Sequence, residues 1–110
     1  MPATYEDANL IVQISRYGVE MGLMEAVPAL FAESFDPELA TQEDKAVRDA
    51  LGFFELVGTL VKQNVLDRGL VMDMWWVSGV WARVEPAARR ARERFGEPRL
   101  YENFEALAAG

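Results

Sequence analysis

Residues 70–84 read LVMDMWWVSGVWARV, and eleven of these fifteen residues are apolar. All three tryptophans of the chain lie in this Trp-rich segment. On a helical wheel Trp76 points to one side, while Val77 and Trp81 point nearly to the other side. A helix with two apolar sides cannot offer an ordinary polar face to water. We therefore expect this segment to form a helix that is central in the fold, or shared between the core and an interface.

Helical periodicity continues on both sides of the Trp-rich segment. The sequence shows no strict apolar–polar alternation and no Asn-Gly or Asp-Gly pair, so nothing in it predicts a β-hairpin. With 110 residues, of which 51% are hydrophobic, the chain fits one compact domain and has no room for a second. We expect a single all-α domain over residues 1–110, a helical bundle of four to six helices.

The N-terminal third predicts two helices and a loop. Thr4 and Asp7, three residues further on, can cap a first helix. The sequence does not fix the residue at which that helix ends, because it contains two glycines there, Gly18 and Gly22. The apolar run at residues 23–31 predicts a second helix, and residues 34–40, which contain Asp-Pro, are the clearest loop.

The strongest predicted helix follows this loop. Thr-Gln-Glu-Asp at residues 41–44 is a capping-box pattern, and residues 42–65 carry apolar side chains around most of the wheel. The wheel leaves one narrow polar stripe, formed by Arg48, Gly52, Glu55, Thr59 and Lys62. We expect this helix and the Trp-rich helix to form the packed centre of the bundle.

The C-terminal part predicts two more helices. Asp67 is placed to cap the Trp-rich helix, and Pro86 predicts a break after it. Residues 85–95 then form an amphipathic helix that Gly96 ends, and residues 99–108 form a short final helix.

The chain contains no cysteine and no histidine. This excludes disulfides, thiol nucleophiles, zinc sites built on thiolate or imidazole, and catalytic triads that need histidine. Only a magnesium or calcium site made of carboxylates is left open, and no loop has the pattern of a calcium-binding hand. We expect neither a cofactor nor a metal site.

The net charge of −7 is distributed unevenly. Residues 1–55 hold eleven acids and three bases, whereas residues 56–110 hold seven acids and eight bases. The acidic first half argues against general binding to nucleic acid or to an anionic membrane. No apolar run reaches the ~20 residues that a membrane-spanning helix needs. Residues 1–7 contain no basic residue, whereas a secretory signal begins with a positively charged segment. We therefore expect a cytoplasmic protein that binds neither nucleic acid nor membrane.

The Trp-rich segment has three interpretations: the core of a monomer, a core that continues into a homo-oligomer interface, or a ligand pocket. The two-sided wheel favours the interface over the core alone, and both over the pocket. The candidate interface or ligand residues are Trp75, Trp76, Trp81, Met74 and Phe54.

Four polar residues are further candidates. Glu55 has apolar neighbours in sequence, and a carboxylate in apolar surroundings can act as a general base. Its place on the polar stripe, between Arg48 and Lys62, favours a structural ion pair or plain exposure instead. We expect Glu102 and Asn103, which lie between two aromatic residues, to anchor the final helix.

Arg89, the fourth polar candidate, belongs to a run of six arginines within residues 83–99. Such a run could contact phosphate, but three glutamates interrupt it and lysine is absent from it. We expect a solvated face that pairs with the acidic first half, with Arg89 bound to Glu85 and Glu93 at a spacing of four residues.

Three short motifs also suggest a family: LGFFE at residues 51–55, the Trp-rich segment, and RLYENF at residues 99–104. Together with a helix that runs on to Asp67 and Gly69, they resemble a bacterial family, the domain of unknown function 4760. The likeness covers residues 46–107. The resemblance implies an all-helical bacterial domain with no assigned activity and no catalytic residues to transfer. Family members often follow a membrane helix, but the first thirty residues here are amphipathic and acidic, which favours a soluble version.

The sequence therefore predicts a non-enzymatic interaction or regulatory module that forms a homodimer through part of its Trp-bearing surface. Whether the module also binds a different protein is left open. The first alternative is a small-molecule sensor whose unidentified ligand lies among Trp75, Trp76, Trp81 and Phe54. The remote alternative is an enzyme that uses Glu55 and Glu102 as paired carboxylates.

Overall fold

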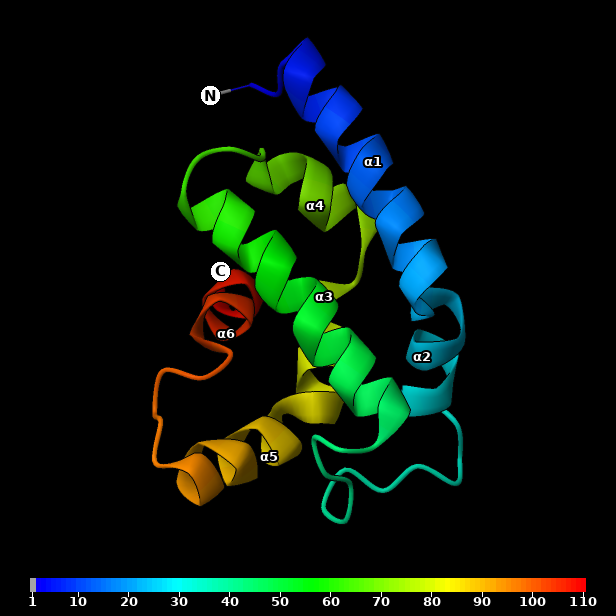
Figure 1. Ribbon diagram of the computed structural model, residues 1–110. Coiled ribbons are helices and arrows are strands. Elements are labelled where there is room, and N and C mark those ends of the chain that lie inside the picture. Colours follow the sequence, from blue (N-terminus) through cyan, green and yellow to red (C-terminus); the bar gives the residue numbers. More distant parts are fainter. Residues whose placement is uncertain (1) are drawn as a thin grey trace.

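The computed structural model describes residues 2–110. Over these residues α-helices are the regular secondary structure, and no strand is present. The six helices are α1 (Tyr5–Met21), α2 (Leu23–Leu30), α3 (Lys45–Lys62), α4 (Arg68–Met74), α5 (Val77–Phe95) and α6 (Glu102–Ala109). Figure 1 shows α3 crossing the middle of the molecule, with α1 and α2 along one side. The prediction of an all-α bundle of four to six helices is confirmed.

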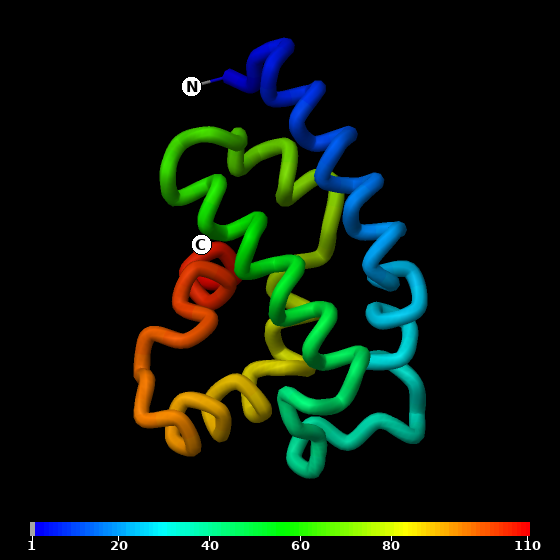
Figure 2. Tube along the Cα trace, in the orientation of Figure 1, coloured from blue at the N-terminus to red at the C-terminus, as the bar shows by residue number. Residues whose placement is uncertain are grey.

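A capping box starts α1, as the sequence predicts. The Thr4 hydroxyl accepts a hydrogen bond from the Asp7 backbone N–H, and the Asp7 carboxylate accepts one from Thr4 N at 2.8 Å. Gly22 ends α1 in the left-handed conformation, with φ at 105°. Since glycine adopts this φ at little cost, the chain turns directly from α1 into α2. The sharp corner between the two helices is visible in Figure 2.

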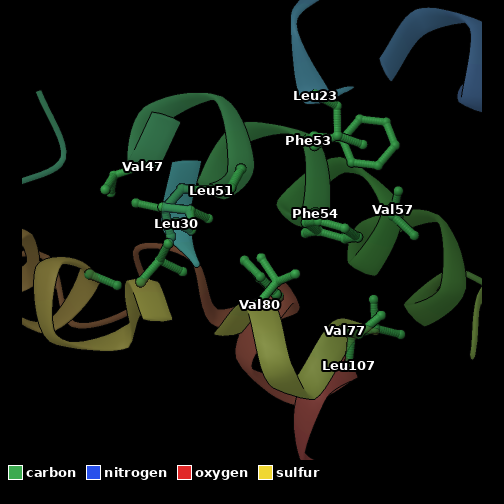
Figure 3. Close-up of a cluster of buried hydrophobic side chains, with 14 of the residues drawn as sticks. Leu23, Leu30, Val47, Leu51, Phe53, Phe54, Val57, Val77, Val80 and Leu107 are labelled. Atoms are coloured by element: carbon green, nitrogen blue, oxygen red, sulfur yellow. The ribbon is translucent and has the colours of Figure 1, made fainter. Parts of the chain in front are cut away.

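The centre of the core lies on α3. Its fully buried side chains include Val47, Leu51, Phe53, Phe54 and Val57. Figure 3 shows these side chains facing residues of α2, α5 and α6, among them Leu30, Val80 and Leu107. Burying a large apolar side chain contributes about 1.5–3 kcal/mol, so this cluster is the main stabilising feature of the bundle.

The ends of α3 lie inside the predicted range of 42–65. Thr41 N donates to the Asp44 carboxylate at 2.9 Å, and Glu43 N donates to the Thr41 hydroxyl at 3.2 Å. The capping signal is therefore present, but its bonds close a separate turn just ahead of the helix. The last helix is displaced as well, since α6 begins at Glu102 rather than at residue 99.

The Trp-rich segment is not one helix, contrary to the sequence prediction. Asp67 caps α4 by accepting a hydrogen bond from Leu70 N at 3.0 Å, but α4 ends at Met74. Trp75 is extended, with φ −132° and ψ 148°, and α5 begins at Val77. Successive side chains of an extended backbone point in opposite directions, so this break resolves the two-sided pattern without burying both sides.

The predicted break at Pro86 is also wrong, because α5 continues through this residue to Phe95. A proline inside a helix costs about 3 kcal/mol, since it removes a backbone N–H and crowds the preceding turn. Pro86, Ala87 and Ala88 are all buried, so their packing offsets this cost. Gly96 ends the helix in the left-handed conformation, as predicted. Within residues 2–110, no helix combines the length and apolar character that crossing a bilayer requires.

Candidate functional site

Two of the three tryptophans belong to the hydrophobic core. Trp75 packs edge-on against Phe53 and Phe54, with ring centroids 5.4 and 6.1 Å apart. Trp81 packs against Phe104 of α6 at 4.9 Å. Both indoles are half-buried, and Phe54 is fully buried. These three candidates therefore hold α3, α5 and α6 together, and they are not gathered around a common pocket.

Trp76 points the other way and is 68% exposed. Its ring stacks on Phe31, which is 41% exposed, with centroids 5.5 Å apart and planes inclined by 13°. The indole also covers the backbone of Gly79 so closely that a Cβ at this position would overlap its ring atoms. A large exposed aromatic ring is thus held on two sides rather than free to rotate.

Arg83 fixes the Phe31 side of this stack. Its guanidinium lies 5.7 Å from the Phe31 ring centre and 5.3 Å from that of Phe35. Its Nε also donates to the Leu30 carbonyl at 2.8 Å, which satisfies the C-terminal end of α2. Arg83 therefore ties the segment after α2 to α5 and sets the position of Phe31.

Two exposed methionines complete an apolar surface beside Trp76. Met72 and Met74, of which Met74 is 54% exposed, line a surface hollow of about 480 Å³ together with Trp75 and Trp76. We call the surface formed by Phe31, Met72, Met74 and Trp76 the Trp76 face. It combines residues from the ends of α2, α4 and α5, which are separate in sequence.

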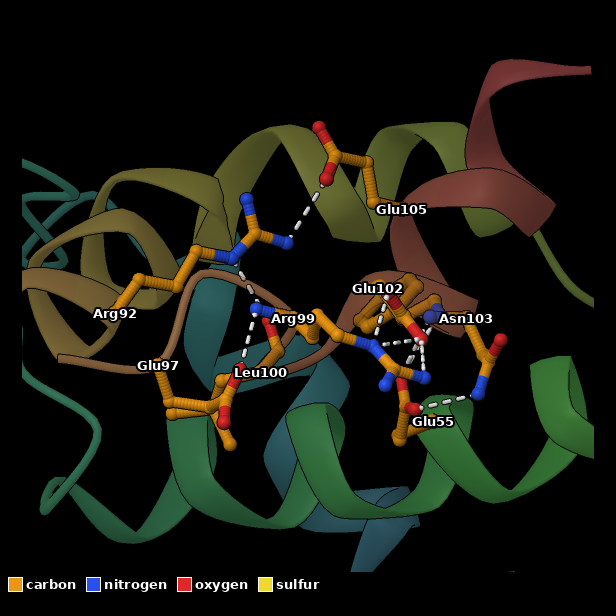
Figure 4. Close-up of polar contacts among 9 residues, drawn as sticks. Glu55, Arg92, Glu97, Arg99, Leu100, Glu102, Asn103 and Glu105 are labelled. Atoms are coloured by element: carbon orange, nitrogen blue, oxygen red, sulfur yellow. Dashed lines mark hydrogen bonds and ion pairs between the residues drawn. The ribbon is translucent and has the colours of Figure 1, made fainter. Parts of the chain in front are cut away.

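Glu55 lies at the junction of α3 and α6, as Figure 4 shows. One of its carboxylate oxygens accepts hydrogen bonds from the backbone N–H groups of Asn103 and Phe104, at 3.0 and 2.9 Å. The other accepts from Asn103 Nδ2 at 2.9 Å, and this amide also donates to Thr59. The start of α6 has no side-chain cap of its own, so Glu55 supplies the acceptors that its first turn needs.

Glu102 pairs with Arg99 at 2.9 Å, and this hydrogen-bonded guanidinium lowers the pKa of the Glu102 carboxyl. Glu55, Glu102 and Tyr101 line one shallow hollow of about 310 Å³. Burial, and secondarily the Glu55 charge, raise the pKa of the Tyr101 hydroxyl. Within residues 2–110 no hydrogen bond joins the two carboxylates, and Glu55 already accepts three bonds from α6. The arrangement is that of a helix anchor rather than of an acid and base pair.

The arginines are mostly used inside the molecule. Arg89 pairs with Glu85 at 2.9 Å, as predicted, but within residues 2–110 it makes no ion pair with Glu93, contrary to the prediction. Arg94 reaches Glu43 of the acidic half at 3.1 Å. Arg90 donates instead to the carbonyls of Pro37 and Ala40. The predicted contacts between these arginines and the first half of the chain are thus made largely with backbone carbonyl oxygens. One guanidinium can donate to several such oxygens at once, because it has five N–H groups.

Sequence reasoning missed two contributors to the Trp76 face, Phe31 and Arg83. The sequence predicts Phe31 at the end of a helix without indicating a partner for it, and it predicts a solvated face for the run of arginines that includes Arg83. The one local signal for Arg83 is that both of its neighbours in sequence, Ala82 and Val84, are apolar. Within residues 2–110 no three carboxylates gather closely enough to hold a metal ion.

The fold and these contacts define an all-helical domain in which several polar side chains join elements and an apolar face is left exposed. A protein-family model, described as Domain of unknown function (DUF4760), matches residues 8–110, nearly the whole chain. The protein belongs to this family, and the match extends beyond the residues 46–107 on which the sequence resemblance rested. No curated protein and no solved structure matches the chain.

Proposed function

We propose that this protein is an interaction module that forms a homodimer through the Trp76 face. The observation that carries the proposal is the Trp76 indole, which is 68% exposed yet held between Phe31 and the Gly79 backbone. A ring fixed before binding loses little conformational entropy when a partner covers it. Tryptophan, arginine and methionine are also enriched at interfaces, and tryptophan is over-represented among the few residues whose truncation costs about 2 kcal/mol or more.

A second copy of the chain is a suitable partner for this face. The protein carries a net charge of −7, so two copies repel each other, and a contact between them must gain its free energy mainly from burying apolar surface. The Trp76 face is apolar, with Asp73 beside it in the same hollow and Arg83 beneath Phe31. In a two-fold dimer the same patch of both copies is in contact, so the apolar residues of the Trp76 face would cover each other reciprocally.

Light scattering over a range of micromolar concentrations tests this proposal. We expect the wild-type mass to rise toward that of a dimer, and Met74→Lys to shift the equilibrium to the monomer by placing a charge in the contact. Phe95→Lys is the matched control, because Phe95 is an exposed apolar residue at the opposite end of α5. The proposal is wrong if the wild type stays monomeric, or if Met74→Lys and Phe95→Lys behave alike.

The hollow beside Trp76 supports a second candidate, a small-molecule sensor. Its volume of about 480 Å³ lies within the usual range for ligand sites, and Trp75 and Trp76 both line it. Trp81 and Phe54, which the sequence had added to this pocket, lie in the core instead. An apolar compound that quenches tryptophan fluorescence without changing the mass of the protein would favour the sensor over the dimer.

A further inference from the structure

A second hollow, remote in sequence from the Trp-rich segment, lies where the corner between α1 and α2 meets the start of α3. Its volume is about 530 Å³, which is in the range of small-molecule sites. Much of its wall is apolar, formed by Val19, Met21, Ala26, Ala29 and Ala46. This hollow contains none of the residues of the Trp76 face and none of the α6 junction.

Asp49 gives this hollow a charged group. It is only 9% exposed, and no other charged residue among residues 2–110 is buried to this degree. Its Oδ2 accepts a hydrogen bond from Lys45 Nζ at 2.5 Å. Its Oδ1 has no hydrogen-bond donor within residues 2–110, and Arg48 Nε lies 4.0 Å from it. A carboxylate oxygen without a donor from the protein keeps acceptor capacity that a bound cation can use.

The Oδ1 atom is not sealed inside the protein. Within residues 2–110 no fully buried side-chain oxygen or nitrogen lacks a hydrogen-bond partner, so Oδ1 must retain access to the surface. The hollow is the surface that Asp49 lines. Gly22 lies directly beside this ion pair, since a Cβ there would be 3.1 Å from Lys45 Nζ and 3.4 Å from Asp49 Oδ2.

The charges around the hollow favour a cation. Glu20, Glu25 and Asp49 line it together with a single base, Lys45. The Lys45 side chain is 70% exposed, so it can leave Asp49 without disturbing the core. An incoming ammonium group can therefore bind the vacant oxygen or replace the lysine.

We propose that the hollow between Gly22, Lys45 and Asp49 binds a small organic cation, a protonated amine attached to an apolar body. The ammonium group pairs with Asp49, the acids of the rim attract it, and the apolar body lies against the alanines of α2 and α3. Neutral compounds of the same shape bind more weakly, because a neutral donor forms a weaker hydrogen bond with a carboxylate than an ammonium group does, and the acids of the hollow repel anionic compounds.

An NMR titration of the full chain with phenethylamine tests the proposal, with phenethyl alcohol as the neutral counterpart. We expect the amine to shift the amides of Gly22 and of the first turn of α3 saturably, with affinity at least about tenfold above that of the alcohol. Equal shifts from the two compounds, or amine shifts that lie elsewhere on the molecule, would overturn it.

Three variants separate this site from a merely structural ion pair. Lys45→Met removes the competing cation at an exposed position and is expected to tighten amine binding about threefold or more. Asp49→Asn should abolish the preference for the amine over the alcohol. If Asp49→Asn does not fold, the double variant Glu20→Gln with Glu25→Gln, which we call the rim variant, replaces it in the test. We expect the rim variant to bind the amine about threefold more weakly than the wild type.

Glu93→Gln is the control for the rim variant, because it removes an exposed acid that does not line the hollow. A binding site predicts an unchanged affinity for this control. If Glu93→Gln weakens binding as much as the rim variant does, the effect is one of net charge and the proposed site is wrong. If Lys45→Met leaves the affinity unchanged, the amine does not use Asp49.

Discussion

Glu55 stabilises a helix other than its own. Tyr101, the residue before α6, has a φ of 63° and offers no side-chain cap. The N–H groups of Asn103 and Phe104 therefore depend on the Glu55 carboxylate, which comes from the middle of α3. A negative charge at this place is also favourable because the N-terminal end of a helix carries a partial positive charge.

Replacing Glu55 with alanine should lower the free energy of unfolding by about 1–3 kcal/mol, because two backbone N–H groups lose a charged acceptor. Glu55→Gln keeps one acceptor oxygen and should cost less. Urea denaturation measures both changes, and Glu93→Ala, at an exposed position on α5, is the control. A loss no larger than that of Glu93→Ala would contradict the capping role.

Asp7 gives the protein a specific response to acid. Hydrogen bonds from Thr4, and a weaker contribution from the N–H of Asp67, lower the pKa of Asp7 below its ordinary value of 3.8. A lowered pKa means that the folded state favours the carboxylate. Its contribution is complete above the ordinary pKa and disappears as the pH falls through the lowered one.

We therefore expect Asp7→Asn to be less stable than the wild type at neutral pH, and the difference to shrink as the pH falls below 3.8. Denaturant titrations of both proteins across this range measure it. Glu6→Gln removes the same charge from the same turn without breaking the capping box. A gap between wild type and Asp7→Asn that stays constant into strong acid would rule out this explanation.

At the scale of elements, two glycines of α3 differ sharply in what surrounds them. A Cβ at Gly58 would overlap the carbonyl of Asn103, so α6 approaches α3 closely only because this side chain is absent. A Cβ at Gly52 would meet nothing within 4 Å, and this residue is exposed. The same substitution in one helix should therefore have opposite effects.

Gly58→Ala should destabilise the protein by about 1–3 kcal/mol by forcing α6 outward. Gly52→Ala should stabilise it by up to about 1 kcal/mol, since alanine restricts the unfolded chain and fits an exposed helical position. Thermal unfolding of the two variants gives the comparison. Equal effects would mean that the contact between α3 and α6 is looser than the structure indicates.

The sequence predicted helices well where local signals decide them. Thr4, Asp67 and Gly96 act as caps at the expected places, because a cap depends on residues a few positions away. The predictions of a continuous helix through Trp75 and of a helix break at Pro86 are wrong for the opposite reason. Whether a helix breaks at either residue depends on tertiary packing, against Phe53 and Phe54 in one case and within a buried face in the other.

The candidate site was predictable only in part. The helical wheel separates Trp76 from Trp81, and Trp76 is exposed while Trp81 is half-buried, but the wheel assumes one continuous helix that the structure does not have. The stack with Phe31 could not be foreseen, since it joins residues 45 positions apart in sequence, and helical periodicity describes one element at a time. The same holds for the three bonds that Glu55 makes with the start of α6.

In the whole molecule, α5 joins the two halves of the chain. Arg83 and Arg90 reach the carbonyls of residues 30–40, so the long connection between α2 and α3 is held by arginines rather than by its own helix. The chain carries a net charge of −7, and the Trp76 face is one of several places where large apolar side chains are exposed.

Dimer formation through this face predicts a stability that depends on protein concentration. Association stabilises the folded state by mass action, so the thermal midpoint should rise by a few degrees for about a tenfold increase in concentration. Met74→Lys should remove this dependence, whereas Phe95→Lys should keep it. Differential scanning calorimetry measures all three, and a wild-type midpoint independent of concentration would argue for a monomer.

Isotope-filtered NMR on a mixture of labelled and unlabelled chains tests the role of the Trp76 face most directly, because it reports only contacts between different copies. The dimer predicts contacts from the methyl groups of Met72 and Met74 in one copy to the Trp76 indole of the other. The absence of such contacts at concentrations where light scattering shows dimers, or their appearance on Val12 and Val19 of α1 instead, would contradict it.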